Sequence, residues 1–428
     1  MADHHQLVPL IKPADADEDE ANSLLRRIRR TNARLASLDV FRGLSVLLMI
    51  FVDYAGPLFP LVAHSPWNGV SLADFVMPYF LFIVGVSLAL AYKRVTNRLQ
   101  ATCKALQRTA GLFLFGVLLQ GGYFHGTTSL TFGVDIESIR CLGILQRISV
   151  GYMVAALCEI WLTSRKEGES TFFKGYYLHG CFAFALAAIY LGLLYGLYVP
   201  DWQFRAPDST SSSLLDNDHI FYKVKCGVRG DLGPACNSAR MIDRRILGLN
   251  HLYRKPAYKN LEVCTGSDNF QVLKDAPPWC HAPFDPEGIL SSFPAAITSI
   301  IGLHYGHVLV RLESHQGCLF HWLLFSVPLF CAGLILNYLG MPLNKSLYSM
   351  SYMLLTSASA GITLSVLYIV VDIYGYRRLT YVLEWMGIHS LSLFILVSSN
   401  LAVIFIQGFY WVSPENNIVH WIISLVRR

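Results

Sequence analysis

Charged residues are scarce in this sequence. Asp, Glu, Lys and Arg make up 15% of its 428 residues, whereas a soluble protein carries about 25%. Hydrophobic residues reach 54% and the mean hydropathy is +0.42. This deficit of charge excludes an ordinary soluble domain and points to a protein that lies largely in lipid. The net charge of +5 is distributed over separate connections, so we predict no nucleic-acid partner.

The chain also has little that marks secretion or metal binding. Its first thirty residues are acidic, then basic, without the apolar core of a cleavable signal peptide. No close C-x-x-C pair occurs. We therefore predict no metal site, with a zinc site kept as the alternative for the cysteines of residues 200–287.

Long apolar segments recur along the whole chain, and all but the short last one have about the 20 residues that a membrane-crossing helix needs. About ten are found: 37–55, 71–92, 106–122, 142–162, 176–199, 288–310, 318–340, 350–373, 381–407 and 417–426. The sequence thus predicts an all-α polytopic membrane protein. Residues 35–199 hold the first five helices and residues 288–428 the last five.

Basic residues cluster on alternate connections between these segments. By the positive-inside rule, both termini are predicted to be cytosolic, with residues 1–34 as a cytosolic tail. That tail has Glu20 four residues before Leu24-Leu25, the spacing of an acidic dileucine signal for lysosome or vacuole; the alternative is a plain solvated tail. Residues 200–287 then face a lumen or the exterior.

This polar segment is predicted to be a domain held by disulfides. It contains four of the ten cysteines, and cysteines on the lumenal side form disulfides. Three pairings remain open for two bonds among Cys226, Cys236, Cys264 and Cys280.

The most informative stretch joins the first two apolar helices: D-Y-A-G-P-L-F-P-L-V-A-H-S-P-W-N-G-V-S-L-A-D. Three prolines exclude a helix, so we expect an ordered loop on the lumenal face. It holds His64 between Asp53 and Asp74. Trp67 and Asn68 provide an aromatic wall and an amide. Asp74 also fits the start of a helix, where its charge complements the helix dipole.

Other polar side chains interrupt apolar segments or their ends, where unpaired charge is costly and is often functional. Asp39 and Arg42 share one helix face and can pair. Arg147 needs an anionic partner, either a protein acid or a ligand phosphate. On the His64 side lie Asp285, Glu287, Lys345 and Ser346, which we expect to contribute to substrate binding.

Several motifs together carry a family resemblance. They are S-L-D-V-F-R-G, D-Y, H-S-P-W-N-G, L-Q-R-I-S, D-P-E-G-I-L and N-K-S-L-Y-S-M-S-Y. Over about residues 34–428 the chain resembles the heparan-α-glucosaminide N-acetyltransferase family of membrane proteins. Relative to the lysosomal enzyme it is expected to lack the lumenal N-terminal domain and one helix, and to carry Asp53 where that enzyme has asparagine.

The resemblance implies a catalytic role for His64, acetyl-CoA as co-substrate and a terminal glucosamine of a heparan-type glycan as lumenal acceptor. A lysosomal or vacuolar membrane is the implied location. We predict that His64 acts as base or is transiently acetylated, with Asp53 fixing its tautomer. Asn68 or the Trp67 N–H would stabilise the oxyanion, and Arg147 and Arg42 would bind the phosphates of the donor.

Two other functions fit the same composition. A solute transporter would have internal symmetry between chain halves, and no convincing repeat is found. An acyltransferase could also act on another lumenal sugar or lipid. In each case membrane lipid is a partner, and a homodimer is compatible with the composition.

Overall fold

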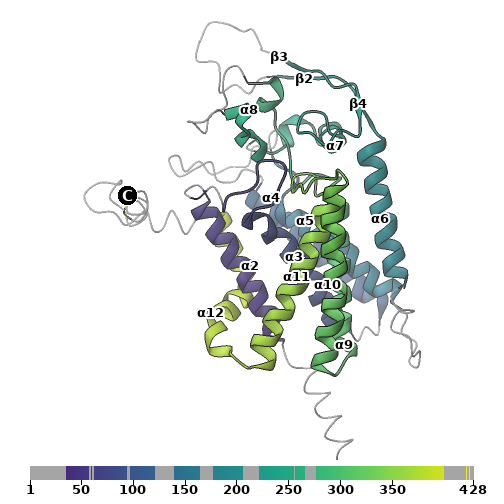
Figure 1. The fold of residues 1–428 in the computed structure, drawn as a ribbon, viewed down its shortest axis with the longest axis vertical. Coiled ribbons are helices and arrows are strands. Elements are labelled where there is room, and N and C mark those ends of the chain that lie inside the picture. The colour runs from purple at the N-terminus through teal and green to yellow at the C-terminus, as the bar shows by residue number, and fades with distance from the viewer. Residues whose placement is uncertain are drawn as a thin grey trace, which may run out of the picture.

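The computed structural model describes residues 35–56, 59, 62–93, 97–120, 139–163, 177–205, 221–254, 256–265, 276–399, 421 and 424. Within these residues, long helices stand side by side as a bundle, and a polar domain caps one end (Figure 1). The predicted tail 1–34 and nearly all of the predicted segment 417–426 lie outside the described residues.

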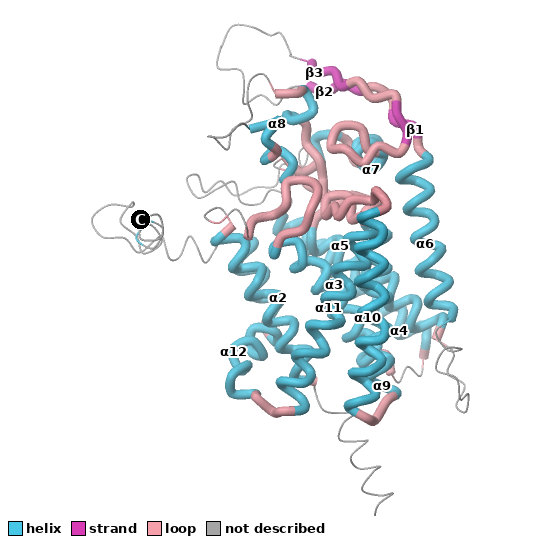
Figure 2. Tube along the Cα trace, viewed as in Figure 1, coloured by secondary structure: helices cyan, strands magenta, loops and turns pink. Residues whose placement is uncertain are grey.

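Each of the first nine predicted segments contains helix. The bundle consists of α2 (Ala36–Ala55), α3 (Leu72–Ala91), α4 (Arg98–Gln120), α5 (Ile144–Leu157) with a π-helical end η1 (Cys158–Leu162), α6 (Tyr177–Gly196), α9 (Ser292–Arg311), α10 (His315–Tyr338), α11 (Met350–Leu367) with a π-helical end η6 (Tyr368–Ile373), α12 (Arg377–Ile388) and α13 (Ser390–Ser398). Figure 2 shows that loops gather at the end of the bundle under the polar domain.

Six of these helices in the described residues are long and apolar enough to cross a membrane: α3, α5 with η1, α6, α9, α10 and α11 with η6. The pair α12 and α13, bent by 67°, would make a seventh. This confirms a helical membrane protein, but not the ten expected spans. Part of the difference lies in charge, because α2 carries Asp39, Arg42 and Asp53, and the first half of α4 is polar. The tenth predicted segment lies almost wholly outside the described residues.

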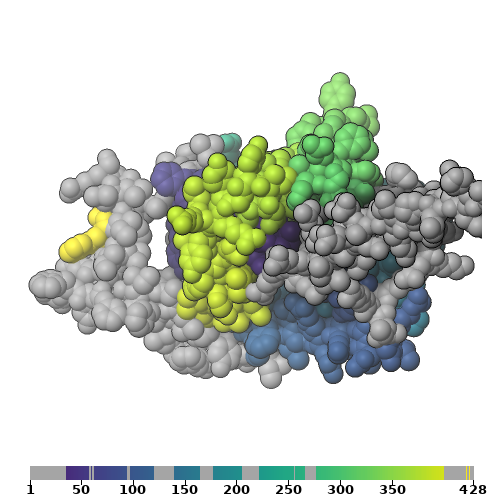
Figure 3. All heavy atoms as spheres, turned by 90° about the horizontal axis from the view of Figure 1, so that it is seen from below, coloured from purple at the N-terminus to yellow at the C-terminus, as the bar shows by residue number. Residues whose placement is uncertain are grey.

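Close backbone contacts hold the bundle together. α3 packs on α9 along its centre, and α2 packs on α12. At the second contact Gly43 and Gly387 face each other's helix, and a Cβ on Gly43 would lie 1.8 Å from the Leu383 carbonyl oxygen. Figure 3 shows the C-terminal helices, in yellow-green, directly beside the green α10. α6 and α10 turn most of their side chains outward, toward the expected lipid.

The polar domain is not all-α, which corrects the prediction. Its elements are the strands β1 (Tyr198–Val199), β2 (Trp202–Arg205), β3 (Phe221–Val224) and β4 (Val228–Arg229), the helices α7 (Ser238–Ile246) and α8 (Glu262–Thr265), and the 3₁₀ turns η3 (Leu249–His251), η4 (Ala257–Asn260) and η5 (Pro278–His281). β1 pairs with β4 and β2 with β3, both antiparallel. The short strands lack the length and alternation that sequence patterns detect.

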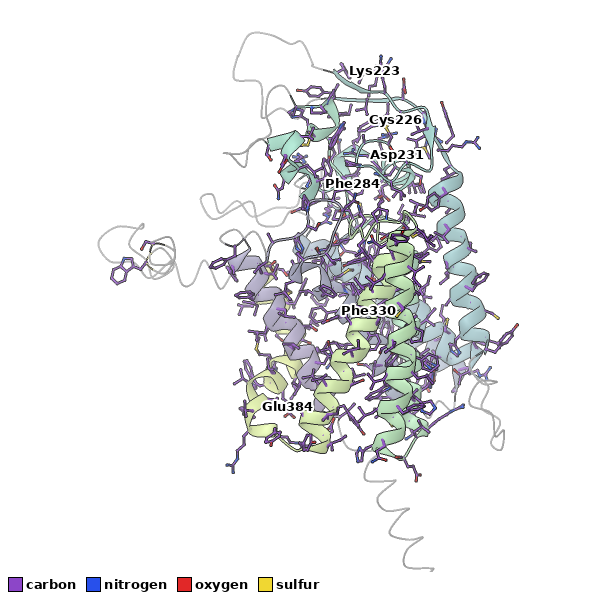
Figure 4. The ribbon with its side chains drawn as sticks, in the orientation of Figure 1. Lys223, Cys226, Asp231, Phe284, Phe330 and Glu384 are labelled. Atoms are coloured by element: carbon purple, nitrogen blue, oxygen red, sulfur yellow. A yellow bond between two sulfur atoms is a disulfide. The ribbon has the colours of Figure 1, made fainter. Side chains whose placement is uncertain are left out.

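The four cysteines of this domain form two disulfides, Cys226–Cys236 and Cys264–Cys280. Of the three pairings left open, the structure has the one that joins neighbours in sequence. The domain's core is built on the buried Arg240, whose guanidinium lies 5.0 Å from the Trp202 ring and 5.6 Å from the ring of Phe284. Phe284 lies low in the domain, toward the bundle (Figure 4), and packs on Trp67.

A buried acid of α7 supports the segment that leads from this domain to α9. Asp243 Oδ1 accepts a hydrogen bond of 2.8 Å from the Ile289 N–H. Its second oxygen is buried without a hydrogen-bond partner, and it would lie 2.0 Å from a Cβ on Gly288, so only glycine fits there. Burial raises the pKa of Asp243 to about 7.

We expect Gly43→Ala to destabilise the bundle. The added methyl group would overlap a backbone carbonyl of α12, and overpacking costs about 1–3 kcal/mol. Thermal unfolding of detergent-solubilised protein would show a lowered melting temperature. Gly192→Ala on α6 is the matched control, because a Cβ there meets nothing within 4 Å. An unchanged melting temperature for Gly43→Ala would refute the close α2–α12 contact.

We expect Asp243→Asn to stabilise the protein increasingly as the pH rises. The folded pKa of Asp243, about 7, lies above the ordinary value of 3.8, so the folded state binds the proton more tightly. Stability is therefore lost as the pH rises from about 4 through about 7, by about 4 kcal/mol in total. Asparagine cannot ionise, so the difference in melting temperature from wild type should grow between pH 5 and pH 8.

The control for this comparison is Glu262→Gln, which removes an exposed carboxylate of α8. It should leave the pH dependence of unfolding unchanged. Parallel melting curves for Asp243→Asn and wild type across that pH range would contradict the assignment.

Candidate active site

One buried carboxylate organises the loop predicted to hold the active site. Asp74, fully buried in the first turn of α3, accepts three hydrogen bonds on Oδ2: from Ser71 N–H at 3.0 Å, Ser71 Oγ at 3.0 Å and Ser65 N–H at 3.3 Å. Its Oδ1 lies 2.9 Å from Nδ1 of His64. Asp74 thus closes the loop from residue 64 to residue 71 around itself.

His64 is exposed at the top of α3, with 42% of its side chain accessible. Because Oδ2 of Asp74 is occupied by donors, the carboxylate fits its ionised state, and Nδ1 of His64 donates to Oδ1. Nε2 is then the ring nitrogen whose lone pair can accept a proton. The partner that fixes the tautomer is therefore Asp74, whereas we predicted Asp53.

Lys345 completes a group of three side chains. Its Nζ lies 2.9 Å from Nδ1 and 3.4 Å from Nε2 of His64, and 3.5 Å from Oδ1 of Asp74. The Lys345 ammonium thereby offsets the charge of the buried Asp74. Sequence analysis placed Lys345 on the same side as His64, and the structure brings the two into direct contact.

Hydrogen bonds join the His64 loop to the loop that carries Lys345. Gly69 N–H donates to the Leu343 carbonyl at 2.8 Å, with φ of +104° at Gly69, a conformation that favours glycine. Asn344 Nδ2 donates to Asn68 Oδ1 at 3.3 Å. Asn68 is therefore a link between the two loops. Ser346 is buried beside them.

Trp67 faces away from His64. Its ring is buried against Tyr258 and Phe284 of the polar domain, and its N–H donates to the Leu232 carbonyl at 3.0 Å. This corrects the prediction that Trp67 forms an aromatic wall beside His64 and that its N–H stabilises the oxyanion. Trp67 instead attaches the loop to the polar domain, because its large apolar ring is better buried there than exposed to water.

Asp285 and Glu287 are joined by an arginine that sequence analysis did not single out. Arg140 donates to Asp285 at 2.6 and 3.0 Å and to Glu287 at 2.6 Å, and its guanidinium lies 4.4 Å from the Tyr253 ring. Burial alone lowers the pKa of Arg140, but these carboxylates raise it above its usual range.

The two acids of this cluster differ in their ionisation. Burial, together with the nearby charge of Glu287, raises the pKa of Asp285 although Arg140 acts in the opposite direction. For Glu287, burial acts in the same direction, but Arg140, Arg147 and Lys345 together hold its pKa below the usual range. Glu287 is therefore the acid of this cluster that is ionised at neutral pH.

Arg147 is fully enclosed. Its guanidinium donates to the Pro286 carbonyl and to Ser291 Oγ, and it lies 5.2 Å from the Tyr348 ring. Two alternative partners were predicted for Arg147, a ligand phosphate and a protein acid. The observed acceptors are neutral groups of the segment before α9, so Arg147 fastens that segment to α5.

A cavity of about 1080 Å³ connects this group to the other end of the bundle. Along α3 its lining runs from Ala73 to Ala91, about 27 Å at the helical rise of 1.5 Å per residue. This is close to the thickness of a bilayer core, about 30 Å. Its upper end is lined by Asp53, His64, Arg140, Tyr253, Glu287 and Lys345.

The middle of the cavity is apolar and its lower end is basic. Met49, Val76, Phe80 and Ile148 are among the apolar lining residues. At the lower end, Arg42 donates to Asp39 and to Ser87, each at 3.0 Å. Arg108 lies 5.2 Å from the ring of Tyr152, whose hydroxyl is 3.4 Å from that of Tyr92.

Of the predicted site residues, Asp53, His64, Arg42, Glu287 and Lys345 line this one cavity. The remaining ones, Asp39, Trp67, Asn68, Arg147, Asp285 and Ser346, lie behind them or at loop contacts. Sequence analysis missed Arg140, Tyr253 and Arg108. Only Arg108 carried a signal, as a basic residue four positions after Lys104 on the same helix.

A separate polar cluster lies at the lower end of α5 and α9. Glu159 Oε2 lies 2.8 Å from His307 Nε2 and 3.0 Å from Thr163 Oγ1, and all three residues are buried. Within the described residues no group of three or more His, Cys, Asp or Glu side chains could hold a metal ion.

Comparisons with known proteins agree with the motifs. Residues 34–191, which include His64 and Asp74, match the model of the family described as "Heparan-alpha-glucosaminide N-acetyltransferase, catalytic". The protein named heparan-alpha-glucosaminide N-acetyltransferase from Mus musculus is 29% identical over 392 residues, which cover 85% of this chain and 53% of that protein.

The protein of the same name from Homo sapiens is 28% identical over 390 residues, covering 85% of this chain and 52% of that protein. The chain thus spans about half the length of the curated relatives it matches. These findings confirm the resemblance that the motifs indicate: the chain is similar to the heparan-alpha-glucosaminide N-acetyltransferases.

Proposed function

We propose that this protein is a transmembrane acetyltransferase that moves an acetyl group from acetyl-CoA to the amine of a terminal glucosamine in a heparan-type or related glycan. The observation that carries the proposal is the cavity with His64 at one end and two arginines at the other. The names of the similar proteins support this acceptor.

The donor binds from the arginine end. Acetyl-CoA carries phosphates at one end and a thioester at the other, joined by a weakly polar arm. Arg42 and Arg108 suit the phosphates, the apolar middle of the cavity suits the arm, and the thioester then reaches toward His64. Arg147 has no part in this path, because it does not line the cavity.

His64 removes the proton that acetyl transfer releases. The acceptor nitrogen attacks the thioester carbon, the C–N bond forms, the C–S bond breaks and CoA leaves as the thiol. Nε2 of His64 accepts the proton from the attacking nitrogen and passes it to the departing sulfur, while Asp74 holds Nδ1–H and stabilises the imidazolium. An acetyl-histidine intermediate would use the same nitrogen and remains the second route.

The acceptor binds at the His64 end. Two carboxylates, those of Asp53 and Glu287, line the cavity there beside Lys345 and Arg140, and Asp74 contacts His64 and Lys345. These carboxylates suit the ammonium form of an amino sugar. Asp53, exposed to the cavity, is in our proposal a substrate-binding residue rather than the orienting partner of His64.

The arrangement of the chain in the membrane follows from the same assignment. Acetyl-CoA is cytosolic, so the arginine end of the cavity faces the cytosol together with both termini. Residues 200–287 and their disulfides then face the lumen of a lysosome or vacuole, in agreement with the positive-inside rule. A homodimer stays a prediction.

A solute transporter is the second candidate, because the cavity extends over most of the bundle length. The two functions differ in their response to acetyl-CoA. An acetyltransferase binds it, and its melting temperature rises with acetyl-CoA concentration. An acyltransferase with another acceptor would do the same, and an acceptor screen with labelled acetyl-CoA would separate it.

We expect His64→Ala to reduce acetylation of glucosamine by purified protein by about 10²–10⁴-fold, the usual contribution of a general base. The assay measures the acetylated sugar formed from labelled acetyl-CoA. His321→Ala on α10 is the control, because that histidine does not line the cavity. Undiminished activity of His64→Ala would remove the catalytic role.

We expect Arg108→Gln to raise the KM for acetyl-CoA by about ten- to a hundredfold, since a hydrogen bond to a charged group contributes about 1.5–3 kcal/mol. The KM for glucosamine should change little. Arg98→Gln, at the start of the same helix and outside the cavity lining, should leave both constants unchanged. Equal effects of the two substitutions would contradict a phosphate site at Arg108.

A further inference from the structure

We propose that Lys345 is itself an acetyl acceptor: when acetyl-CoA occupies the cavity without an amino sugar, the acetyl group is transferred to Nζ of Lys345. This inference rests on the proposed acetyltransferase function. It adds a modification site, and with it a way in which the enzyme can inactivate itself.

The position of the amine carries the inference. Nζ of Lys345 lies 2.9 Å and 3.4 Å from the two ring nitrogens of His64, and both residues line the same cavity. A thioester held within reach of the amine of an amino sugar at His64 is therefore within one side-chain rotation of Nζ, because lysine has a flexible four-carbon stem. The side chain is 17% exposed, so the cavity contents can reach it.

The backbone of Lys345 is held firmly, so the amine stays near the imidazole. The Lys345 carbonyl accepts from Tyr348 N–H at 3.0 Å, and the neighbouring Asn344 is buried with its Oδ1 accepting from Leu347 N–H at 2.8 Å. Tyr348 has φ of +51°, a left-handed conformation that is uncommon for a residue with a side chain. These hydrogen bonds and the left-handed residue fix the backbone conformation of the turn 344–349.

Electrostatics explains why the lysine is not consumed during turnover. Only a neutral amine attacks a thioester, whereas Nζ of Lys345 is ion-paired with Asp74 of α3 at 3.5 Å and shares the cavity lining with Asp53 of α2 and Glu287 of the segment before α9, so it must leave this ion pair and lose a proton before it reacts. Nε2 of His64, 3.4 Å from Nζ, is the neighbour that can accept its proton. Lys345 is therefore a slow acceptor that competes when no substrate amine is present.

The step balances as ordinary acetyl transfer. The C–N bond to Nζ forms and the C–S bond of the thioester breaks. Of the two protons that the Lys345 ammonium loses, one passes through His64 to water and the other goes to the departing sulfur, so that CoA leaves as the thiol. The product is a neutral amide, so Asp74 loses the cation that offsets its buried charge. A protein acetylated at Lys345 should have lost activity toward glucosamine.

The test uses the purified full chain in detergent, incubated with acetyl-CoA at pH 8 with or without excess glucosamine. Peptide mass spectrometry measures acetylation at Lys345 and at Lys223, an exposed lysine of β3 at the far end of the polar domain (Figure 4). We expect Lys345 to be acetylated at least about tenfold faster than Lys223, and glucosamine to suppress acetylation at Lys345 only.

Two variants make the result specific. His64→Ala should slow acetylation at Lys345 by about 10²-fold or more and leave Lys223 unaffected, since it removes the base. Lys345→Arg keeps the positive charge. Whatever its starting rate of glucosamine acetylation, preincubation with acetyl-CoA should not lower that rate further, whereas wild type loses activity as Lys345 is modified.

Two outcomes would overturn the inference and are distinguishable. Normal acetylation of glucosamine with Lys345 unmodified, or modified no faster than Lys223, would refute self-acetylation and leave the proposed function standing. Absence of acetylation on both glucosamine and Lys345, with acetyl-CoA present, would refute both.

Discussion

The burial of Asp74 is the constraint on which the site depends. A carboxylate with no exposure to solvent is expensive unless donors and a counter-charge surround it. Two N–H groups, one hydroxyl, the His64 ring and the Lys345 ammonium supply them, and the hydroxyl of Tyr352 donates to the Asp74 backbone carbonyl. Satisfying one buried charge thus fixes the loop, the imidazole and the lysine together.

A second group of charges fastens the polar domain to the bundle. Arg140 precedes α5, while Asp285 and Glu287 precede α9, so their ion pairs join two helices beneath the domain. Trp67 contributes apolar contact at the same junction by packing on Tyr258 and Phe284. The domain and the bundle therefore share one interface, and the mouth of the cavity lies within it.

The distribution of charge along the cavity relates this architecture to acetyl transfer. The cavity has basic side chains at one end, apolar side chains along the middle and carboxylates at the His64 end. The basic end suits the phosphates of a thioester donor, and the His64 end suits the amine that the donor meets. The lining comes from helices far apart in sequence, including α13, which begins at the break after His389. The bend of 67° between α12 and α13 brings Ser390 and Phe394 to the cavity wall.

The sequence by itself determined the helices, the His64 loop and the four cysteines that pair, because apolar length, prolines and cysteine content are local properties of the chain. It also placed Lys345 on the side of His64 through the alternation of basic connections. Only the tertiary structure decided which acid is hydrogen-bonded to His64. Asp53 and Asp74 both flank the loop in the sequence, and it is the packing of the helices that buries Asp74 and leaves Asp53 exposed. The same holds for Arg140, Tyr253 and Arg108, whose partners lie on other helices, and for Arg147, which spacing could not distinguish from a ligand-binding arginine.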